Sequence, residues 1–452
     1  MFKKILVANR GEIALRIIRA CRDLDIQSVA VYSEADQKSL HVKAADETIC
    51  IGPAMSAASY LNIENIIQAA ERVGADAIHP GYGYLAEKKE FAEACEANRI
   101  VFIGPTPDNL QLAGDKVTAK RIMAEAGIAV IESSPGGVTN LDNAVDICKK
   151  IGYPVVVKAS GGGGGRGIRV CSDENALRED FAIAKAEAAA AFKNDALYIE
   201  KYIENPRHIE FQILGDKNGN ITHLGERECT IQRRYQKLIE EAPSPRLSIG
   251  LRQAMGKTAV QAAAAVKYFN AGTVEFLLDS DGNFYFMEMN SRIQVEHPVT
   301  ELTTGIDLVK EQIRLSAGGI IDYSYDDLCL RGCAIECRIN AEDPERSFLP
   351  SPGIIEEFTP PGGFGVRLDT HLYQGYELPI YYDSLIAKLI AFDLTRNGAI
   401  SIMKRALAEF AIAPVKTTIP LYRRIMDDSS FQEGNFDTEF IHQFVPEEDD
   451  FD

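Results

Sequence analysis

Polar and apolar residues alternate through the stretch of residues 284–298, and this pattern limits the fold more than any other feature of the chain. Successive side chains of a β-strand point to opposite faces. One face would then be polar, with Glu288, Asn290, Arg292 and, if the chain stays extended, Gln294 and Glu296. The other face would be able to pack on a core, with Tyr285, Met287, Met289, Ile293 and Val295. We therefore expect a half-buried strand with one highly charged face.

A second segment, residues 273–277, places Glu275 on a strand of similar kind. Glu275, Glu288 and Asn290 together offer two carboxylates and an amide, with no cluster of histidines near them in the sequence. Such hard oxygen ligands suit Mg²⁺ better than Zn²⁺, and Mg²⁺ usually shares its shell with nucleotide phosphates. The pattern thus predicts a magnesium–nucleotide site. The alternative interpretation is a solvent-facing polar strand with ordinary surface ion pairs.

A run of glycines at residues 161–167 lies between two apolar, strand-like segments. It contains a formal GxGxxG match, but a dinucleotide-binding loop must open a helix, whereas a strand follows here. A glycine loop between two strands favours a flap whose bare amides close over phosphates. Lys158, on the preceding strand, can direct a cation at the same phosphates. A flexible linker is the alternative.

Two further polar segments are candidates for anion binding. In residues 332–340 the apolar face consists of Cys333, Ile335, Cys337 and Ile339, and the polar face of Glu336, Arg338 and Asn340. This strand is expected to present Arg338 to an anion, or else to pair it with a structural carboxylate. Residues 227–237 form a net-positive island in an acidic chain, which indicates either an anion pocket or solvated surface charge.

Two other patterns imitate known motifs. The segment 250–258 looks like a P-loop, but five residues separate its glycines where the motif has four, and no strand precedes it. We interpret it as a helix with an exposed lysine. Cys329, Cys333 and Cys337 are spaced by four, which would suit a metal on a helix, but the segment is strand-like. We interpret Cys333 and Cys337, on the apolar face of this strand, as packing residues.

The order of predicted elements indicates several regions. Residues 4–33 read as strand, helix and strand, and similar units continue to about residue 110, which predicts a doubly wound parallel sheet. Further along, the pattern predicts helices over 116–126 and 174–193, strands alternating with turns over 197–286, a β-rich part after 330, and a last helix over 397–410.

Composition excludes some classes of function. The chain has 452 residues with 48 Lys and Arg against 66 Asp and Glu, a net charge of −18, which argues against general nucleic-acid binding. It contains no run of 18 apolar residues that would span a membrane, and its first residues lack a signal peptide. Nine cysteines without any CxxC pattern favour a reducing, cytoplasmic setting.

Taken together, the motifs resemble those of biotin carboxylase, a family of the ATP-grasp superfamily. The resemblance spans roughly residues 2 to 445 and rests on the segments 9–12, 79–83, 158–167, 200–202, 205–208, 288–298, 336–342 and 360–366. It implies a mixed α/β and α+β fold with three domains. These are a doubly wound pre-ATP-grasp domain (1–114), an ATP-grasp domain (115–330) with a mobile lid at about 131–203, and a β-rich C-terminal domain (331–446), followed by an acidic tail (447–452).

The resemblance also implies a reaction, in which ATP and bicarbonate form carboxyphosphate and biotin on a carrier protein is then carboxylated. The implied nucleotide contacts are Lys116, Lys158, Gly164, Gly165, Glu200, Lys201, Tyr202, Ile203, His208, Tyr235, Glu275, Leu277 and Glu288. The implied ligands for one or two Mg²⁺ or Mn²⁺ ions are Glu275, Glu288 and Asn290. The implied bicarbonate and biotin pocket consists of Lys237, Arg292, Gln294, Val295 and Arg338.

Four residues are implied in catalysis: Lys237, Arg292, Glu296 as the base on bicarbonate, and Arg338 as the stabiliser of the biotin enolate. Tyr235 stands where the family often has histidine, which puts that nucleotide contact in doubt, and Tyr84, Ala86 and Lys88 also depart from the usual pattern.

The implied partners are a second copy of the chain, a carboxyltransferase subunit, and a separate biotin carrier, since no biotin-attachment sequence is present. The parent complex would be an acetyl-CoA, propionyl-CoA or pyruvate carboxylase, which serves fatty acid synthesis or anaplerosis. Two alternatives stay open: another ATP-grasp ligase, of the carbamoyl-phosphate synthetase or purine-pathway kind, and a non-catalytic nucleotide-binding regulator.

Overall fold

The computed structural model describes residues 1–159, 169–192 and 195–445. The predicted nucleotide contacts Gly164 and Gly165, with the rest of the glycine run, lie outside the described residues, and so does the acidic tail. Within the part of the chain that is described, no helix has the length and apolar character needed to cross a membrane.

The N-terminal region is a five-stranded sheet in the order β3-β2-β1-β4-β5, and every neighbouring pair is parallel. Its strands are β1 (Lys4–Val7), β2 (Gln27–Ser33), β3 (Glu47–Gly52), β4 (Ala77–His79) and β5 (Val101–Phe102). Its helical segments are α1 (Gly11–Asp23), η1 (Glu34–Asp36), α2 (Leu40–Ala44), η2 (Ser56–Ala58), α3 (Ile63–Val73) and α4 (Lys89–Ala97). Ile5 and Leu6 pack into two different core clusters, so both faces of the sheet are covered and the doubly wound prediction is confirmed.

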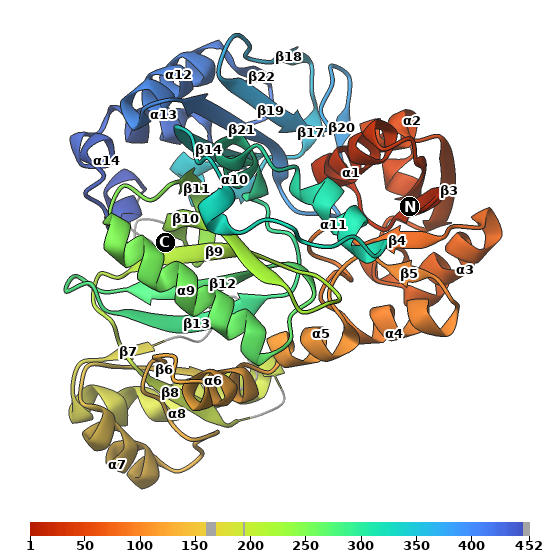
Figure 1. Ribbon diagram of the computed structural model, residues 1–452. Helices are drawn as coiled ribbons and strands as arrows, with labels where there is room; N and C mark the ends of the chain where they lie inside the picture. Colours follow the sequence, from red (N-terminus) through yellow and green to blue (C-terminus); the bar gives the residue numbers. More distant parts are fainter. Residues whose placement is uncertain (160–168, 193–194, 446–452) are drawn as a thin grey trace.

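A small antiparallel sheet in the order β7-β6-β8 lies at one end of the molecule, at the bottom of Figure 1. Its strands are β6 (Val155–Ala159), β7 (Arg169–Cys171) and β8 (Leu197–Lys201), and its helices are α7 (Leu141–Ile151) and α8 (Glu174–Phe192). Two helices, α5 (Pro107–Gly114) and α6 (Lys116–Glu125), precede this unit in the chain. Val155, Val157 and Leu177 belong to a core cluster of its own, so this unit packs around its own apolar residues.

The largest sheet has eight antiparallel strands in the order β13-β12-β9-β10-β11-β14-β21-β19. These strands are β9 (Arg207–Gly215), β10 (Ile221–Arg233), β11 (Gln236–Ala242), β12 (Asn270–Leu278), β13 (Phe284–Asn290), β14 (Cys333–Asn340), β19 (Val366–Thr370) and β21 (Leu385–Asp393). The associated helices are α9 (Ile249–Ala265), α10 (His297–Thr304) and α11 (Leu308–Ser316). One continuous sheet therefore joins the central and C-terminal regions (Figure 1).

The predicted extended strand over 284–298 is only partly correct. β13 ends at Asn290 and α10 begins at His297, with Pro298 in its first turn. Proline suits the first turn of a helix because its missing N–H has no partner there in any case. Gln294 and Glu296 thus reach the site through a turn and not through strand alternation.

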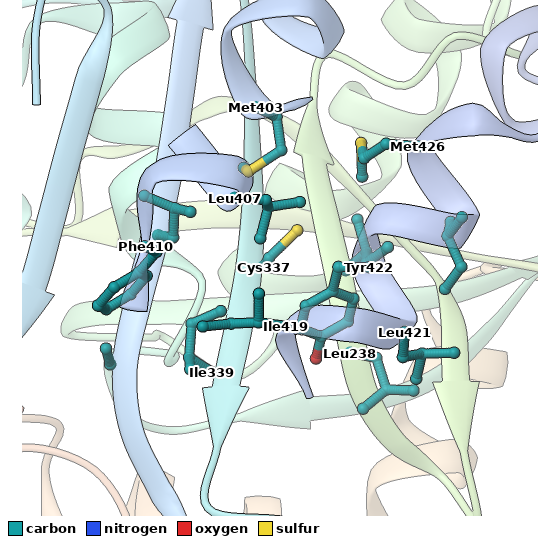
Figure 2. Packing of buried hydrophobic residues seen from close by; sticks show 14 of the residues in the cluster. Leu238, Cys337, Ile339, Met403, Leu407, Phe410, Ile419, Leu421, Tyr422 and Met426 are labelled. Atoms are coloured by element: carbon teal, nitrogen blue, oxygen red, sulfur yellow. The ribbon is translucent and has the colours of Figure 1, made fainter. Parts of the chain in front are cut away.

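The C-terminal region packs helices on one face of β14 and β21, around the apolar cluster that Figure 2 shows. Its remaining elements are η3 (Tyr325–Asp327), β15 (Glu342–Asp343), η4 (Pro344–Arg346), β16 (Leu349–Pro350), β17 (Gly353–Ile354), β18 (Glu357–Thr359), β20 (Glu377–Leu378), α12 (Arg396–Glu409), β22 (Ala411–Ala413), α13 (Ile419–Asp427), α14 (Ser429–Glu433) and η5 (Phe440–Phe444). Cys337 lies in this cluster next to Tyr422, in agreement with its interpretation as a packing residue. The helix predicted over 397–410 is α12 and lies at the predicted position, but α13 and α14 follow it, so the prediction that it is the last helix is wrong.

Candidate functional site

A cavity of about 1260 Å³ lies where the three-stranded sheet, the eight-stranded sheet and the C-terminal region meet. Lys158 of β6, Glu288 of β13 and Arg338 of β14 all line it. Among the predicted site residues that the structure describes, Glu296 alone does not line the cavity. Glu296 is fully buried behind the wall, where it contacts two lining residues, Lys237 and Arg338.

The predicted metal ligands come together on β12 and β13. Glu275 and Glu288 are directly opposite each other in the antiparallel register, and Asn290 Nδ2 donates to Glu275 Oε1 at 2.6 Å. Lys116 Nζ lies 2.5 Å from Glu288 Oε2. Burial raises the pKa of Glu288, but the charge and hydrogen bond of Lys116, together with His208 and Lys237, outweigh it and leave that pKa below its ordinary value. Burial likewise raises the pKa of Glu275, but Lys237 and His208 outweigh it and lower that pKa to about 2. Both carboxylates are thus charged at neutral pH, as ligands for a divalent cation must be.

The chemistry of this donor set fits Mg²⁺ or Mn²⁺, because two opposed carboxylates and an amide oxygen provide hard oxygen ligands. Among the described residues, two groups have side-chain atoms close enough together to hold a metal ion: His208, Glu210 and Glu275, and Glu210, Cys229 and Glu296. Burial raises the pKa of the Cys229 thiol well above its ordinary value, so the thiol keeps its proton and is a poor metal ligand. The first of these groups shares Glu275 with the predicted ligands, and Glu275, Glu288 and Asn290 stay the predicted metal ligands.

Lys237 forms the centre of a buried charge cluster. Its Nζ lies 2.6 Å from Glu210 Oε2, 2.6 Å from Glu296 Oε1 and 3.4 Å from Glu275 Oε1. Burial lowers the pKa of Lys237, but Cys229 and the three carboxylates outweigh it and raise that pKa well above its ordinary value. A permanently charged lysine thus connects the predicted metal ligands to the predicted base.

Arg338 approaches Glu296 from the other side. Its Nη2 lies 2.9 Å from Glu296 Oε2, and its Nε donates to Glu240 Oε1 at 2.6 Å. Burial and the nearby Glu210 raise the pKa of Glu296, whereas Lys237 and Arg338 lower it, and the net pKa is below the ordinary value. Glu296 is therefore ionised at neutral pH and able to accept a proton.

The segment between β13 and α10 supplies the remaining predicted anion contacts. Arg292 Nε lies 3.0 Å from Glu87 Oε2, and its Nη1 donates to Gln294 Oε1 at 2.8 Å. Gln294 Nε2 in turn donates to Thr273 Oγ1 at 3.0 Å. The carbonyl of Val295 accepts from Lys388 Nζ at 2.9 Å, which fixes the backbone there. Arg292, Gln294 and Val295 thus stand side by side at the cavity wall.

From the small sheet, Glu200 of β8 contacts two lysines, Lys158 and Lys120. Burial raises the pKa of Glu200, but these lysines outweigh it and lower the pKa. Glu200 thus holds two cations at the wall of the cavity: Lys158 on β6, the strand that precedes the glycine run, and Lys120 on α6. This arrangement suits a phosphate chain.

The remaining predicted nucleotide contacts in the described part of the chain also line the cavity. Lys201 Nζ donates to the carbonyls of Gly152 and Tyr153 at 3.0 and 2.9 Å, while Tyr202, Ile203 and Leu277 line the cavity. His208 Nε2 lies 2.8 Å from Glu275 Oε2 and so lies beside the predicted metal ligands as well. Tyr235 is 58% exposed and has a positive φ of 63°, at the tip of the β10–β11 hairpin.

The basic island at 227–237 does not act as one anion pocket. Arg227 is fully buried and its Nε lies 2.5 Å from Glu210 Oε1. Arg233 lies over the ring of Phe348, 4.3 Å from its centroid. Lys237 is thus the member of this island that both lines the cavity and contacts the predicted base.

Sequence reasoning missed several charged residues of the site, namely Glu87, Lys120, Glu210, Glu240 and Lys388. One local signal was available, because His208, Glu210 and Gln212 alternate on β9 as the polar residues of β13 do. For the other four residues, the contact with the site depends on which distant segments of the chain become neighbours, and no local sequence pattern reveals that.

Three family models match the chain in succession. Residues 1–110 match "Biotin carboxylase, N-terminal domain", residues 115–323 match "Carbamoyl-phosphate synthase L chain, ATP binding domain", and residues 336–443 match "Biotin carboxylase C-terminal domain". Among curated proteins, Biotin carboxylase 1 of Bacillus subtilis is 53% identical over 445 residues, covering 98% of this chain and 99% of the relative. The biotin carboxylase of Haemophilus influenzae is 54% identical over 444 residues, covering 98% and 99%.

The solved structures that resemble this chain are also biotin carboxylases. The biotin carboxylase domain dimer of Hydrogenobacter thermophilus 2-oxoglutarate carboxylase, in complex with MgADP, ADP and bicarbonate, has a TM-score of 0.93 and 52% identity, covering 99% of this chain and 100% of that one. The biotin carboxylase–β,γ-ATP complex of Campylobacter jejuni has a TM-score of 0.94 and 47% identity, covering 98% and 99%.

Proposed function

The chain belongs to the biotin carboxylase family, and we propose that it uses ATP and bicarbonate to carboxylate biotin on a separate carrier protein. The observation that carries this proposal is the ionised, fully buried Glu296, which lies between Lys237 and Arg338. A base with a cation on each side suits a small anion that must lose a proton before it reacts. Arg292 and Gln294 stand at the cavity wall next to it, where they can orient that anion.

The first half-reaction is the phosphorylation of bicarbonate. Glu296 accepts the bicarbonate proton, and a bicarbonate oxygen attacks the γ-phosphorus of ATP, so that the bond between that phosphorus and ADP breaks and carboxyphosphate forms. Lys237 and Arg292 balance the negative charge of the anion during this attack. Phosphoryl transfer depends mainly on such positioning and charge neutralisation.

The nucleotide would lie across the two strand systems that face the cavity. Lys158 and Lys116 offer cations to its phosphates, and Glu275, Glu288 and Asn290 would hold the divalent cation. When bound, Mg²⁺ or Mn²⁺ neutralises phosphate charge and orients the γ-phosphate. In the free protein, Lys116 contacts Glu288, so a bound cation would exchange this ion pair for one to phosphate.

The second half-reaction transfers the carboxyl group from carboxyphosphate to N1 of biotin: the bond between the carboxyl carbon and the phosphate oxygen breaks, phosphate leaves and takes up the N1 proton, and a bond forms between N1 and the carboxyl carbon. Arg338 places its guanidinium where the ureido oxygen gains negative charge as biotin loses its N1 proton. The guanidinium suits this role because it is planar and permanently charged. Carboxyphosphate hydrolyses readily, so a covering lid that excludes water would serve a clear purpose.

The partners of this chain follow from the same proposal. Biotin must arrive on a carrier polypeptide, and a carboxyltransferase subunit must use the carboxybiotin. The Hydrogenobacter relative is a dimer, and we propose a homodimer here too. Capture of the chain from its source, followed by identification of the biotinylated partner, would decide whether the complex acts on an acyl-CoA or on a 2-oxo acid. A cytoplasmic location stays a prediction.

Two alternatives are less well supported. A carbamoyl-phosphate synthetase-like or purine-pathway ligase would share the central ATP-binding region, but the matches on both sides of that region are to biotin carboxylase. A non-catalytic regulator would have no use for a base held ionised between two cations.

An ATPase assay separates these possibilities. We expect ATP cleavage that depends on bicarbonate, together with carboxylation of free biotin. ATP cleavage without bicarbonate, or with ammonia as co-substrate, would favour another ligase, and nucleotide binding without cleavage would favour a regulator.

A further inference from the structure

Two glutamates lie opposite each other in the sheet directly behind Arg338. Glu240 of β11 and Glu336 of β14 are partners in the antiparallel register, and both have no exposed surface. Like charges directly opposite each other on neighbouring strands repel, and burial makes each charge more costly. Two ionised carboxylates in this position would therefore destabilise the sheet.

Three oxygens of this pair have no hydrogen-bond partner among the described residues. They are both side-chain oxygens of Glu336 and Oε2 of Glu240. The fourth oxygen, Glu240 Oε1, accepts from Arg338 Nε at 2.6 Å. A buried carboxylate without a donor pays its full desolvation cost, so a donor is missing here. A proton on one carboxyl group would provide that donor.

Arg338 contacts Glu240, but the other charged groups near the pair have partners elsewhere. The charged groups that act on the pair are Lys237 from β11, Arg338 from β14, Lys388 from β21 and Glu296 just before α10. The helix α10, which packs on β14 and β11, also carries His297 and Glu301. Lys388 Nζ donates to the Val295 carbonyl and lies 3.3 Å from Glu12 Oε1. Glu301 Oε1 lies 2.8 Å from Arg16 Nη2.

Burial keeps a proton on this pair at neutral pH. Burial raises the pKa of Glu336. The charge of Lys388 opposes this shift and the charge of Glu240 adds to it, and the net pKa of Glu336 lies well above its ordinary value. Burial also raises the pKa of Glu240, to about 7, although Arg338 opposes the shift. His297 is no source of positive charge, since burial holds its pKa well below the ordinary value.

We propose that Glu240 and Glu336 share one proton and that this carboxyl–carboxylate pair positions Arg338 for the transfer of the carboxyl group to biotin. The O–H of Glu336 donates to Glu240 Oε2, which fixes the carboxylate whose Oε1 receives Arg338. Glu336 does not touch the reacting atoms, so it is a positioning residue that acts through Glu240. The proposal rests on the role proposed above for Arg338.

The shared proton also sets the charge around the guanidinium. With the proton in place, Arg338 faces two carboxylates, Glu240 and Glu296. After its loss a third negative charge stands behind Arg338 and weakens its attraction for the developing enolate. Carboxylation should therefore decline at alkaline pH by about tenfold per pH unit above the pKa of the pair, while ATP cleavage declines less.

Infrared spectroscopy of the full chain tests the shared proton without reference to activity. We expect a protonated-carboxyl band at neutral pH that disappears in Glu336→Gln and remains in Glu241→Gln. Glu241 is a matched control because it lies on the same strand, is buried and pairs with Arg396 on the opposite face of the sheet. Identical carboxyl bands in wild type and Glu336→Gln would overturn the proposal.

The pH profile tests the positioning role. The measured quantity is the ratio of the biotin carboxylation rate to the rate of bicarbonate-dependent ATP cleavage. In wild type and in Glu241→Gln this ratio should fall at alkaline pH, whereas in Glu336→Gln it should stay level, since the amide has no proton to lose. The same alkaline fall in Glu336→Gln would contradict the positioning role.

A second measurement covers the case in which Glu336→Gln does not fold. In the wild-type protein the protonated-carboxyl band should disappear with rising pH in step with the ratio of the two rates, and a band that titrates independently of that ratio would overturn the proposal. If ATP cleavage shows no dependence on bicarbonate, the proposed function fails, and the infrared band still reports on the shared proton.

Discussion

Replacement of Arg338 by lysine should separate the two half-reactions. In the folded chain one guanidinium reaches two carboxylates at once, with Nε 2.6 Å from Glu240 Oε1 and Nη2 2.9 Å from Glu296 Oε2. A lysine carries the same charge on a single nitrogen and lacks the planar fork, so it cannot make both contacts in that geometry. Its charge would no longer be held where biotin develops its negative oxygen.

The size of the effect follows from these contacts. Loss of one oriented donor to a developing oxyanion costs about 10²–10³ in rate, or about 2.7–4 kcal/mol. ATP cleavage should fall by less than about tenfold, because Lys237 remains 2.6 Å from Glu296 Oε1 and keeps that carboxylate ionised. Lysine is preferable to alanine here, since removal of one partner of a buried ion pair destabilises a protein by about 3–5 kcal/mol.

The assay measures carboxylation of free biotin and bicarbonate-dependent ATP cleavage in the same preparation. Arg396→Lys is a suitable control, because Arg396 pairs with Glu241 on the opposite face of the same sheet, at 2.6 Å. Both rates of this control should stay close to those of wild type, because Arg396 does not line the cavity. An equal fall of both rates in Arg338→Lys would show that Arg338 serves bicarbonate, and the division of roles would then be wrong.

Three further changes test other parts of the site. Glu296→Gln should abolish ATP cleavage and carboxylation together, because the amide cannot accept the bicarbonate proton; loss of carboxylation alone, in steady-state assays of both rates, would remove Glu296 from the first step. Glu288→Gln should abolish ATP cleavage while the circular dichroism spectrum stays unchanged, and near-normal turnover at saturating Mg²⁺ would contradict the metal assignment. Asp36→Asn tests a structural pair: burial raises the pKa of Asp36, but Arg10 outweighs it and holds the pKa well below the ordinary value. Because that pKa is depressed, the pair stabilises the fold above pH ~4 and less as the pH falls further. Urea unfolding of Asp36→Asn should therefore show a free energy of unfolding lower than that of wild type by about 3–5 kcal/mol at pH 7, and by less in acid. An equal difference at neutral and acid pH would contradict the ion pair.

Much of the site was predictable because strand alternation is a local property. The alternating residues of β13 predicted that Glu288 and Asn290 share a face, and the structure confirms this with Glu275 opposite. The same rule failed beyond Asn290, where a helix that begins at His297 turns the chain. Period-two alternation alone does not show where a strand ends, and Pro298 was the local signal for the change.

The contacts between distant segments were not predictable from one sequence. Glu240 meets Arg338 because β11 and β14 are neighbours, although 98 positions separate the two residues. Lys120 meets Glu200 because α6 packs near the small sheet, and the helical pattern of residues 116–126 does not indicate that partner. The roles of the site residues came from the resemblance to a family, and the structure adds which charges surround each of them.

The most direct test of the proposed reaction is the fate of the bicarbonate oxygen. The chain is incubated with ATP, Mg²⁺, free biotin and bicarbonate labelled with ¹⁸O, and the phosphate that forms is examined by mass spectrometry. Attack of bicarbonate on the γ-phosphorus leaves one bicarbonate oxygen on that phosphorus, so one ¹⁸O should appear in each phosphate released. Unlabelled phosphate, formed at the rate of ATP cleavage, would mean that water and not bicarbonate attacks ATP, and would contradict the mechanism proposed for Glu296 and Lys237.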